Sequence, residues 1–441
     1  MKRWILVIAL LFILPLLYFV KGALAAEQPQ RSIVVFRDID TASQKRTHIE
    51  AFHGTWRKDL RIIRAAAADL TQIQINQLKK DPHVLRIDPD VQVFALTQRL
   101  PQPTIVANAF SWCSRFPTLP GCGPTPTQTP KPSPTPTPTP RPTSSPTPSP
   151  TPGGATPTPT PTPSNSQTIQ WGVTRIGAPT AWTTSTGTGV KVGVIDTGIS
   201  RTHPDLQANI AGCVSFITGV ATCEDDNGHG SHVSGIIAAV NNTVGVVGVA
   251  PNAKLYALKT LNSQGSGYLS DIISALDWSV TNGIQVVNMS LGTTSDIQSF
   301  HDAVTRAYNA GIIEVVAAGN NGPGTNTVIY PGAYPEVIAV AATDSSDNVP
   351  SWSSRGPQVD IAAPGVNIYS TYKNGGYATL SGTSMATPHV TGSVALRLAT
   401  HPGESFAQMY SDLQSTADPL PLGSSLVGAG LVDAQKLVAA P

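Results

Sequence analysis

A chain of 441 residues is long enough to form more than one folded domain. Charged residues make up only 12% of it and the formal net charge is +1, so no surface for nucleic acid or for an anionic membrane is indicated. We therefore expect its partners to be recognised through shape and local chemistry.

The N-terminus has the pattern of a secretory signal peptide. Lys2 and Arg3 precede an apolar run from Trp4 to Val20, and Ala23-Leu-Ala25 offers a cleavage site after Ala25. Because the run is also close to the length of a membrane span, an uncleaved anchor is the alternative. We expect residues 1–25 to be removed and the remaining chain to be secreted.

Residues 26–100 have the mixed pattern of a small α+β domain. We expect a strand at Ser32–Phe36, an amphipathic helix at Asp69–Lys80 and one or two strands between Val84 and Phe94. A segment of this size folds alone only marginally. An independent binding module is one interpretation of this segment.

A linker at residues 101–166 follows, rich in threonine and proline. Its Thr-Pro repeats between Pro124 and Pro163 cannot build a core. An extended spacer of polyproline type is therefore predicted, with many sites for O-glycosylation.

The four cysteines form two closely spaced pairs, Cys113 with Cys122 and Cys213 with Cys223. In an exported chain such cysteines are expected to form disulfides. Three pairings are possible, and we expect the local one. A zinc site is the alternative, but neither pair has the C-x-x-C spacing typical of one.

Residues 167–441 alternate between strand and helix patterns, which predicts an α/β domain with a mostly parallel sheet and helices on both faces. The expected strands are Val190–Ile195, Lys254–Lys259, Gln285–Met289, Ile312–Ala317 and Val337–Ala342. The expected helices are His232–Val240, Leu269–Asn282, Ile297–Ala310 and Met385–Thr400.

Polar residues fall where these strands end. Asp196, Ser290 and Asn320 each follow an apolar strand, and the carboxyl ends of parallel strands collect reactive groups. Ser384 lies in Ser381-Gly-Thr-Ser-Met385 before an apolar helix, where free N–H groups and the helix dipole favour negative charge. Taken alone, Ser384 reads as an ordinary helix cap.

His229 completes the pattern, in the glycine-rich stretch Asn227-Gly-His-Gly-Ser231. Alone it reads as a loop histidine, as Asp196 alone reads as a turn-capping carboxylate. The chain order Asp196, His229, Ser384 is, however, the order of the subtilisin triad. From about Gln167 to the C-terminus the chain resembles the subtilisin-like serine proteases of the peptidase S8 family.

This resemblance implies an acyl-transfer site. Ser384 would be the nucleophile, His229 the general base, and Asp196 the group that orients the imidazole. Asn320, in Ala317-Ala-Gly-Asn320, would donate to the oxyanion together with the backbone N–H of Ser384.

The resemblance also implies how substrate is held. Ser290, Leu291 and Gly292 would pair with the substrate backbone as an added strand. Gly319 would border the pocket for the residue before the scissile bond, and Ile329 would line its bottom. A branched apolar side chain there suggests a shallow pocket that prefers apolar or small groups.

A structural calcium ion (Ca2+) is implied as well, in the stretch Val240-Asn-Asn-Thr-Val-Gly-Val246. Its ligands would be oxygens, the donor type that calcium prefers. The implied set is Gln167, Asp205, Val240, Asn242, Val244 and Val246. A plain asparagine-rich turn is the alternative.

Residues 26–100 resemble the inhibitory propeptide that precedes such catalytic domains. The resemblance implies an intramolecular inhibitor that assists folding, places its tail near Phe94-Ala-Leu-Thr97 in the cleft and is then cut. The Thr-Pro linker departs from the usual arrangement and leaves the processing site open.

We therefore predict a secreted, calcium-stabilised serine endopeptidase, monomeric and acting on proteins or peptides. A catalytically idle scaffold on a Thr-Pro stalk is the second interpretation, although Asp196, His229, Asn320 and Ser384 are all present. An esterase is the third, and the absence of a Gly-x-Ser-x-Gly motif at Ser384 argues against it.

Overall fold

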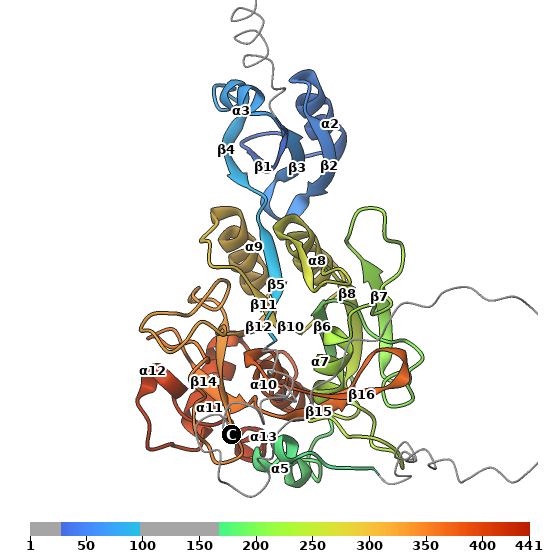
Figure 1. Ribbon diagram of the computed structural model, residues 1–441, viewed down its shortest axis with the longest axis vertical. Helices are drawn as coiled ribbons and strands as arrows, with labels where there is room; N and C mark the ends of the chain where they lie inside the picture. The colour runs from blue at the N-terminus through green and yellow to red at the C-terminus, as the bar shows by residue number, and fades with distance from the viewer. Residues whose placement is uncertain (1–27, 98–166) are drawn as a thin grey trace, which may run out of the picture. The chain divides into compact units, whose positions relative to one another are not determined.

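The computed structural model describes residues 28–97 and 167–441 (Figure 1). The expected signal peptide, the Thr-Pro linker and the pair Cys113 and Cys122 lie outside the described residues. In the ranges that are described, no helix has both the length and the apolar character needed to cross a bilayer.

A seven-stranded sheet forms the centre of residues 167–441. Its order is β14-β13-β12-β10-β6-β8-β7, and every neighbouring pair is parallel. Its inner strands are rich in Val, Ile and Ala because a parallel sheet is covered on both faces. The strands are β6 (Lys191–Asp196), β7 (Ile210–Ser215), β8 (Lys254–Lys259), β10 (Val286–Met289), β12 (Ile313–Ala317), β13 (Ile338–Thr343) and β14 (Ile361–Pro364).

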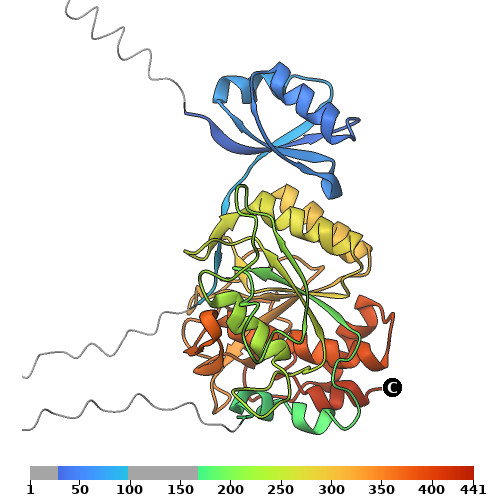
Figure 2. The same cartoon turned by 90° about the vertical axis from the view of Figure 1, so that its right-hand side faces the viewer.

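Helices cover both faces of this sheet (Figures 1 and 2). One face packs against α8 (Leu269–Thr281) and α9 (Gln298–Asn309), and the other against α7 (His229–Ala238) and α10 (Thr383–Thr400). In α8 the apolar stripe Leu269, Ile272, Ile273 and Leu276 follows the helical period, which is why this face is buried. The α/β architecture predicted from the sequence is confirmed.

Shorter elements complete this part of the chain. Outside the large sheet, β15 and β16 form an antiparallel ribbon, and β9 and β11 each pair with β5 of residues 28–97. The elements are α5 (Trp171–Arg175), α6 (Ala178–Ala181), β9 (Ser266–Tyr268), β11 (Leu291–Gly292), β15 (Ile368–Thr371), η2 (Lys373–Gly375), β16 (Tyr377–Leu380), α11 (Phe406–Thr416), α12 (Ser424–Val427) and α13 (Ala434–Ala439).

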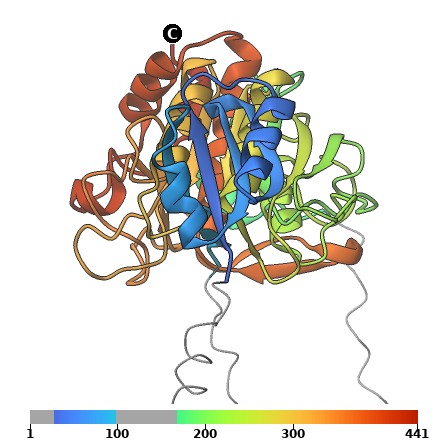
Figure 3. The ribbon, with the colours of Figure 1, turned by 90° about the horizontal axis from the view of Figure 1, so that it is seen from above.

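Residues 28–97 form a four-stranded antiparallel sheet of order β2-β3-β1-β4. Two helices cover one face of it through Ile49, Ile75 and Leu78 (Figure 3). On the other face, Ile33 and Val35 join the apolar cluster that contains α8 and α9. The elements are β1 (Gln30–Phe36), α2 (Ala42–Ala51), β2 (Thr55–Leu60), η1 (Arg61–Ile63), β3 (Ala65–Leu70), α3 (Gln72–Leu78), β4 (Val84–Pro89) and β5 (Gln92–Ala95).

The helix expected at Asp69–Lys80 is wrong at its start. Asp69 and Leu70 end strand β3, and α3 begins only at Gln72. Thr71 sets this boundary, because its hydroxyl accepts from the N–H of Gln74 while the Gln74 side chain accepts from the Thr71 N–H. The sequence analysis also did not anticipate α2, β2 or β3.

Candidate functional site

The polar residues at the strand ends meet at one edge of the sheet, as predicted. Asp196 is the last residue of β6, Ser290 follows β10, and Asn320 lies three residues after β12. Strands β12, β10 and β6 are consecutive neighbours in the parallel sheet. Their carboxyl ends therefore bring the three side chains to the same edge.

Asp196 and His229 form a buried pair. The Nδ1 atom of His229 lies 2.7 Å from Asp196 Oδ1 and 2.9 Å from Oδ2, and both side chains are almost fully excluded from solvent. Burial lowers the pKa of His229, but the charge and hydrogen bond of Asp196 outweigh it and leave the pKa above its ordinary value. This arrangement fixes the tautomer in which Nε2 is free to accept a proton.

The helix that carries His229 begins three residues earlier than expected, at His229 itself. The sequence analysis missed the reason, which is the buried carboxylate of Asp225. Its oxygens accept from the backbone N–H groups of Asn227, Gly228 and Ser231 at 2.8–3.0 Å, so they satisfy the open helix end. An acidic residue four positions before a glycine-rich helix start is the signal that indicates such a cap.

Ser384 is the second residue of α10, which follows Gly382, a glycine with a positive φ. Its hydroxyl donates to the backbone carbonyl of Ser290 at 3.0 Å, and the Ser290 hydroxyl donates to the Ser384 carbonyl at 3.0 Å. Among the described residues, the buried Nε2 of His229 has no hydrogen-bond partner. The structure thus pairs Asp196 with His229 but does not bring Ser384 and His229 into a hydrogen bond.

Asn320 contacts a segment that lies far away in the sequence. Its side-chain Nδ2 donates to the carbonyl oxygen of Leu96 at 2.8 Å. Its Oδ1 accepts from both the backbone N–H and the hydroxyl of Thr383, at 3.0 and 2.9 Å. A carbonyl oxygen of residues 28–97 therefore accepts a hydrogen bond from the side chain predicted as the oxyanion donor.

The segment before Leu96 is held as a strand. Strand β5 pairs antiparallel with β11 on one side and with β9 on the other. Beyond it, the N–H of Leu96 donates to the Ser290 carbonyl at 3.2 Å, and the N–H of Ala95 donates to the Gly265 carbonyl at 2.9 Å. Ser290, Leu291 and Gly292 therefore contact an extended segment of this chain, and the second edge, Gly265–Tyr268, was not among the predicted residues.

The residues expected to border a side-chain pocket lie together. A Cβ atom added to Gly292 would meet Ile329 and the Tyr330 carbonyl, and one added to Gly319 would meet Ile329 and Ser354. Both glycines therefore border the Ile329 side chain. A separate cavity of about 280 Å³ adjoins His229, with Asn227, Gln264, Tyr372 and Leu380 among its lining residues.

Most residues of the expected calcium set converge. The Gln167 side-chain nitrogen lies 2.7 Å from the Val240 carbonyl, 3.3 Å from Asn242 Oδ1 and 3.0 Å from the Val246 carbonyl. Turning this amide over would add its oxygen to the ring.

Asp205 borders the same ring, because its carboxylate accepts from the Asn242 side chain and from the N–H of Val246. Val244 donates its N–H to Asn242 Oδ1 at 2.7 Å. Within the described ranges, no cluster of three or more His, Cys, Asp or Glu side chains could hold a metal. A set built mainly from carbonyl and amide oxygens nevertheless fits calcium chemistry.

The expected local disulfide between Cys213 and Cys223 is confirmed.

Comparison with known proteins agrees with this geometry. Residues 187–432 match the subtilase family, peptidase S8. Subtilisin Savinase of Lederbergia lenta is 48% identical over 271 residues, which cover 61% of this chain and 98% of the relative. An alkaline protease of Alkalihalobacillus alcalophilus is 48% identical over 271 residues, covering 61% of this chain and 70% of the relative.

Subtilisin E of Bacillus subtilis (strain 168) is 46% identical over 275 residues, covering 61% of this chain and 71% of the relative. The matched region contains the parallel sheet and the edge at which Asp196, His229, Asn320 and Ser384 lie. The chain therefore belongs to the subtilase family and is a subtilisin-like serine endopeptidase.

Proposed function

We propose that this protease is secreted as a self-processing precursor and cuts its own Leu96–Thr97 bond. One observation carries the proposal: the Leu96 carbonyl oxygen accepts from Asn320 while the Leu96 N–H donates to Ser290. Residues 92–96 thus occupy the cleft as a substrate would, with an extended backbone paired on both edges.

In the proposed reaction, Ser384 Oγ attacks the Leu96 carbonyl carbon and His229 Nε2 takes the hydroxyl proton. The negative oxygen that forms is held by Asn320 Nδ2 and by backbone N–H groups at the start of α10. When the C–N bond breaks, His229 returns the proton to the amine of Thr97. Water then enters, His229 takes its proton, and the acyl-enzyme is hydrolysed to free the Leu96 carboxylate.

We propose that residues 28–96 act as the intramolecular inhibitor of this site. Two carboxylates support this role by capping helices of the catalytic part: Asp90 accepts from the N–H and hydroxyl of Ser270, and Asp88 from the N–H of Ser299. Such caps satisfy open N–H groups and complement the helix dipole. After cleavage they would keep the fragment bound over the cleft.

We also propose that the Gln167–Val246 region binds one structural calcium ion. The ring of oxygens around the Gln167 amide supports this. Calcium would neutralise Asp205 and hold the loop, and it would take no part in the reaction. Secretion is proposed from the apolar N-terminal segment that ends at Ala25.

The test compares purified wild-type precursor with Ser384→Ala and with Ser393→Ala, a control on the same helix. Each is treated with an active-site serine reagent and then examined by intact mass and N-terminal sequencing. Wild type and Ser393→Ala should be labelled and should yield a new N-terminus at Thr97. Ser384→Ala should stay full-length and unlabelled, because its nucleophile is gone.

A second pair of variants tests the position of the cut. Leu96→Met keeps an apolar side chain of similar size and should be cut at the same bond. Leu96→Asp places a charge at the apolar pocket beside Ile329, so cleavage there should slow by at least about 100-fold. Cleavage of both variants at an unchanged rate, or a new N-terminus elsewhere, would contradict the proposed site.

A further inference from the structure

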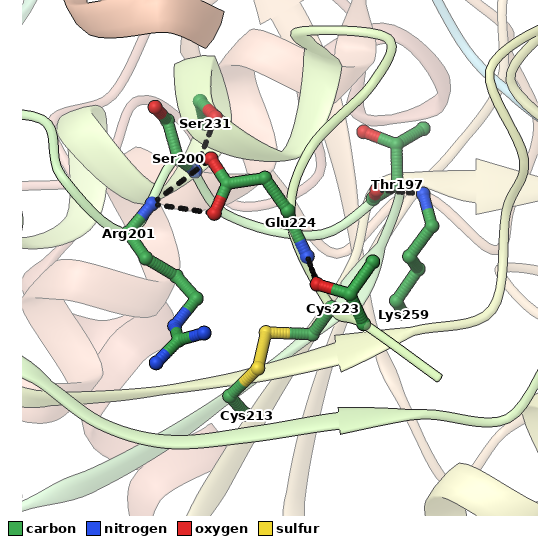
Figure 4. The surroundings of a disulfide bond; sticks show 9 residues. Thr197, Ser200, Arg201, Cys213, Cys223, Glu224, Ser231 and Lys259 are labelled. Carbon is green, nitrogen blue, oxygen red and sulfur yellow. Dashed lines mark hydrogen bonds between the residues drawn. A yellow bond between two sulfur atoms is a disulfide. The ribbon is translucent and has the colours of Figure 1, made fainter. Parts of the chain in front are cut away.

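A disulfide links an exposed edge strand to the segment that leads into the His229 helix. Cys213 lies on β7, the last strand of the seven-stranded sheet, and is exposed. Cys223 is fully buried and stands six residues before His229. Figure 4 shows the sulfur atoms bridging the strand and this segment, with Glu224 directly beyond Cys223.

The segment contacts the residues that follow Asp196. The Cys223 carbonyl accepts from the N–H of Ile199 at 3.1 Å, and a Cβ atom at Gly198 would collide with that carbonyl. The Glu224 carboxylate accepts from the N–H of Arg201 at 3.3 Å (Figure 4). Cys223 and Glu224 therefore fix the path of the chain leaving strand β6.

The same segment contacts the start of the His229 helix. Asp225 accepts from the Thr197 hydroxyl at 2.8 Å and from the N–H and hydroxyl of Ser231 at 2.8 and 2.6 Å. The Thr197 hydroxyl oxygen in turn accepts from the N–H of Gly230 at 2.9 Å, and Asn227 Oδ1 accepts from the N–H of His229 at 3.1 Å. One short segment thus holds both partners of the buried pair.

Lys259 is a further restraint on this segment. Its buried ammonium group contacts the carbonyl of Thr197 and lies 2.7 Å from the Asp226 carboxylate. Because half of the Asp226 side chain is exposed, water screens this ion pair. The disulfide is the covalent restraint, and it acts at the beginning of the segment.

We propose that the Cys213–Cys223 disulfide is a positioning element for the Asp196–His229 pair, an inference that rests on the proposed triad. Without the bridge, the segment 223–228 gains conformational freedom, and Asp225 holds Thr197 and Ser231 less firmly. The imidazole then spends less time at the angle that proton transfer requires. Substrate binding should change little, because Leu291, Gly292 and Asn320 lie on other elements.

The test replaces both cysteines in the full chain, Cys213→Ser with Cys223→Ser, and compares the matured enzyme with wild type. Turnover of a peptide amide should fall about 10-fold in kcat, with KM within about twofold, since small misplacements cost rate. Proton NMR should show the low-field resonance of the His229 Nδ1 proton broadened or lost. Thr218→Ala, in the same loop, is the matched control and should leave both readings unchanged.

Thermal stability falls whether the bridge positions the pair or only stabilises the fold, so kcat is measured well below the melting point. An unchanged kcat and an unchanged histidine resonance in the double variant would overturn the proposal. If the double variant does not fold, wild-type protein is reduced and alkylated in its folded state instead. Its kcat and its His229 resonance are then measured in the same way. Labelling of wild type by the active-site serine reagent distinguishes failure of this proposal from failure of the proposed triad. If the triad is wrong, neither wild type nor any variant should be labelled.

Discussion

Both ends of the Asn320 side-chain amide are in use. The Thr383 backbone N–H can only donate, so its contact with Asn320 fixes which end of the amide is the oxygen. The nitrogen is then left to face Leu96. Thr383 is therefore a positioning residue for the oxyanion donor, and it stands next to the proposed nucleophile in the sequence.

Replacing Asn320 should reduce the rate far more than it reduces binding. We expect Asn320→Ala to lower kcat by about 100- to 1,000-fold with a small change in KM, because the donor is needed most when charge develops. Steady-state kinetics on a peptide amide measures this. Asn321→Ala is the matched control at the next position, and a loss in Asn320→Ala below about tenfold would remove the oxyanion role.

Strand β12 carries a carboxylic acid where its neighbours are apolar. Glu314 is fully buried, and among the described residues neither side-chain oxygen has a hydrogen-bond partner. Val316 lies on the same face of the strand and packs with Phe300 of α9. Burial, with a contribution from Glu336, raises the pKa of Glu314 well above its ordinary value.

No charged neighbour offsets the cost of burying an ionised Glu314 carboxylate among the described residues. Glu336 carries the same charge, so it raises the pKa of Glu314 further; its carboxylate lies 3.1 Å from His301 Nε2 and accepts from the Thr305 hydroxyl at 3.0 Å. The folded state therefore keeps Glu314 protonated while the unfolded chain ionises it. The stability that depends on this proton is present below the ordinary glutamate pKa and is lost as the pH rises toward the raised value.

Glu314→Val should accordingly stabilise the fold, and increasingly so at higher pH. Between the two pKa values, wild type should lose about 1.4 kcal/mol of unfolding free energy per pH unit relative to the variant. Urea unfolding at several pH values, in the uncleaved Ser384→Ala background, measures this. Glu314→Gln keeps the buried polar group but cannot ionise, so it should share the flatter pH dependence; parallel curves for all three forms would refute the assignment.

The sequence predicts the elements of this molecule better than their contacts. The apolar strands β6 and β12 could be predicted because a parallel sheet needs buried residues on both faces. The strand Ala65–Leu70 could not be predicted, since alanine favours helix and it is the pairing with β1 and β2 that makes this segment extended. The cap at Asp225 was missed because the sequence analysis placed the helix start at His232, three residues after the observed start at His229.

Contacts across the whole molecule are the least predictable. The ion pair between Lys58 and Asp271 joins residues that are more than 200 positions apart, and neither position carries a local sign of its partner. The family resemblance supplied the roles of Ser384 and Ile329, which no periodicity indicates. The place of Leu96 against Asn320 was anticipated only as a region, Phe94–Thr97.

At the scale of the whole molecule, the uncut chain makes the contacts of the cleft and those of the expected calcium loop at the same time. Leu96 contacts Asn320 in the cleft, while Gln167 contacts Val240 and Val246 in the expected calcium loop. Residues 98–166 join them covalently, so the Leu96–Thr97 bond does not have to break before Gln167 reaches its loop. Calcium binding should therefore not require self-cleavage.

The full-length Ser384→Ala precursor, which cannot cut itself, should bind one calcium ion and melt at a higher temperature with calcium than with a chelator. A ligand at about 100 times its dissociation constant adds about 2.7 kcal/mol to the folded state. Gln167→Ala in the same background should weaken this effect, because one of the converging groups is lost, whereas exposed Gln207→Ala should not. Calcium found in the cleaved enzyme but not in the uncut precursor would mean that cleavage has to release residues 97–167 before the loop can close around the ion. If calcium is found in both the precursor and the cleaved enzyme, and raises both melting temperatures equally, the calcium loop already stabilises the precursor. The time of cleavage would then depend on the active-site residues alone.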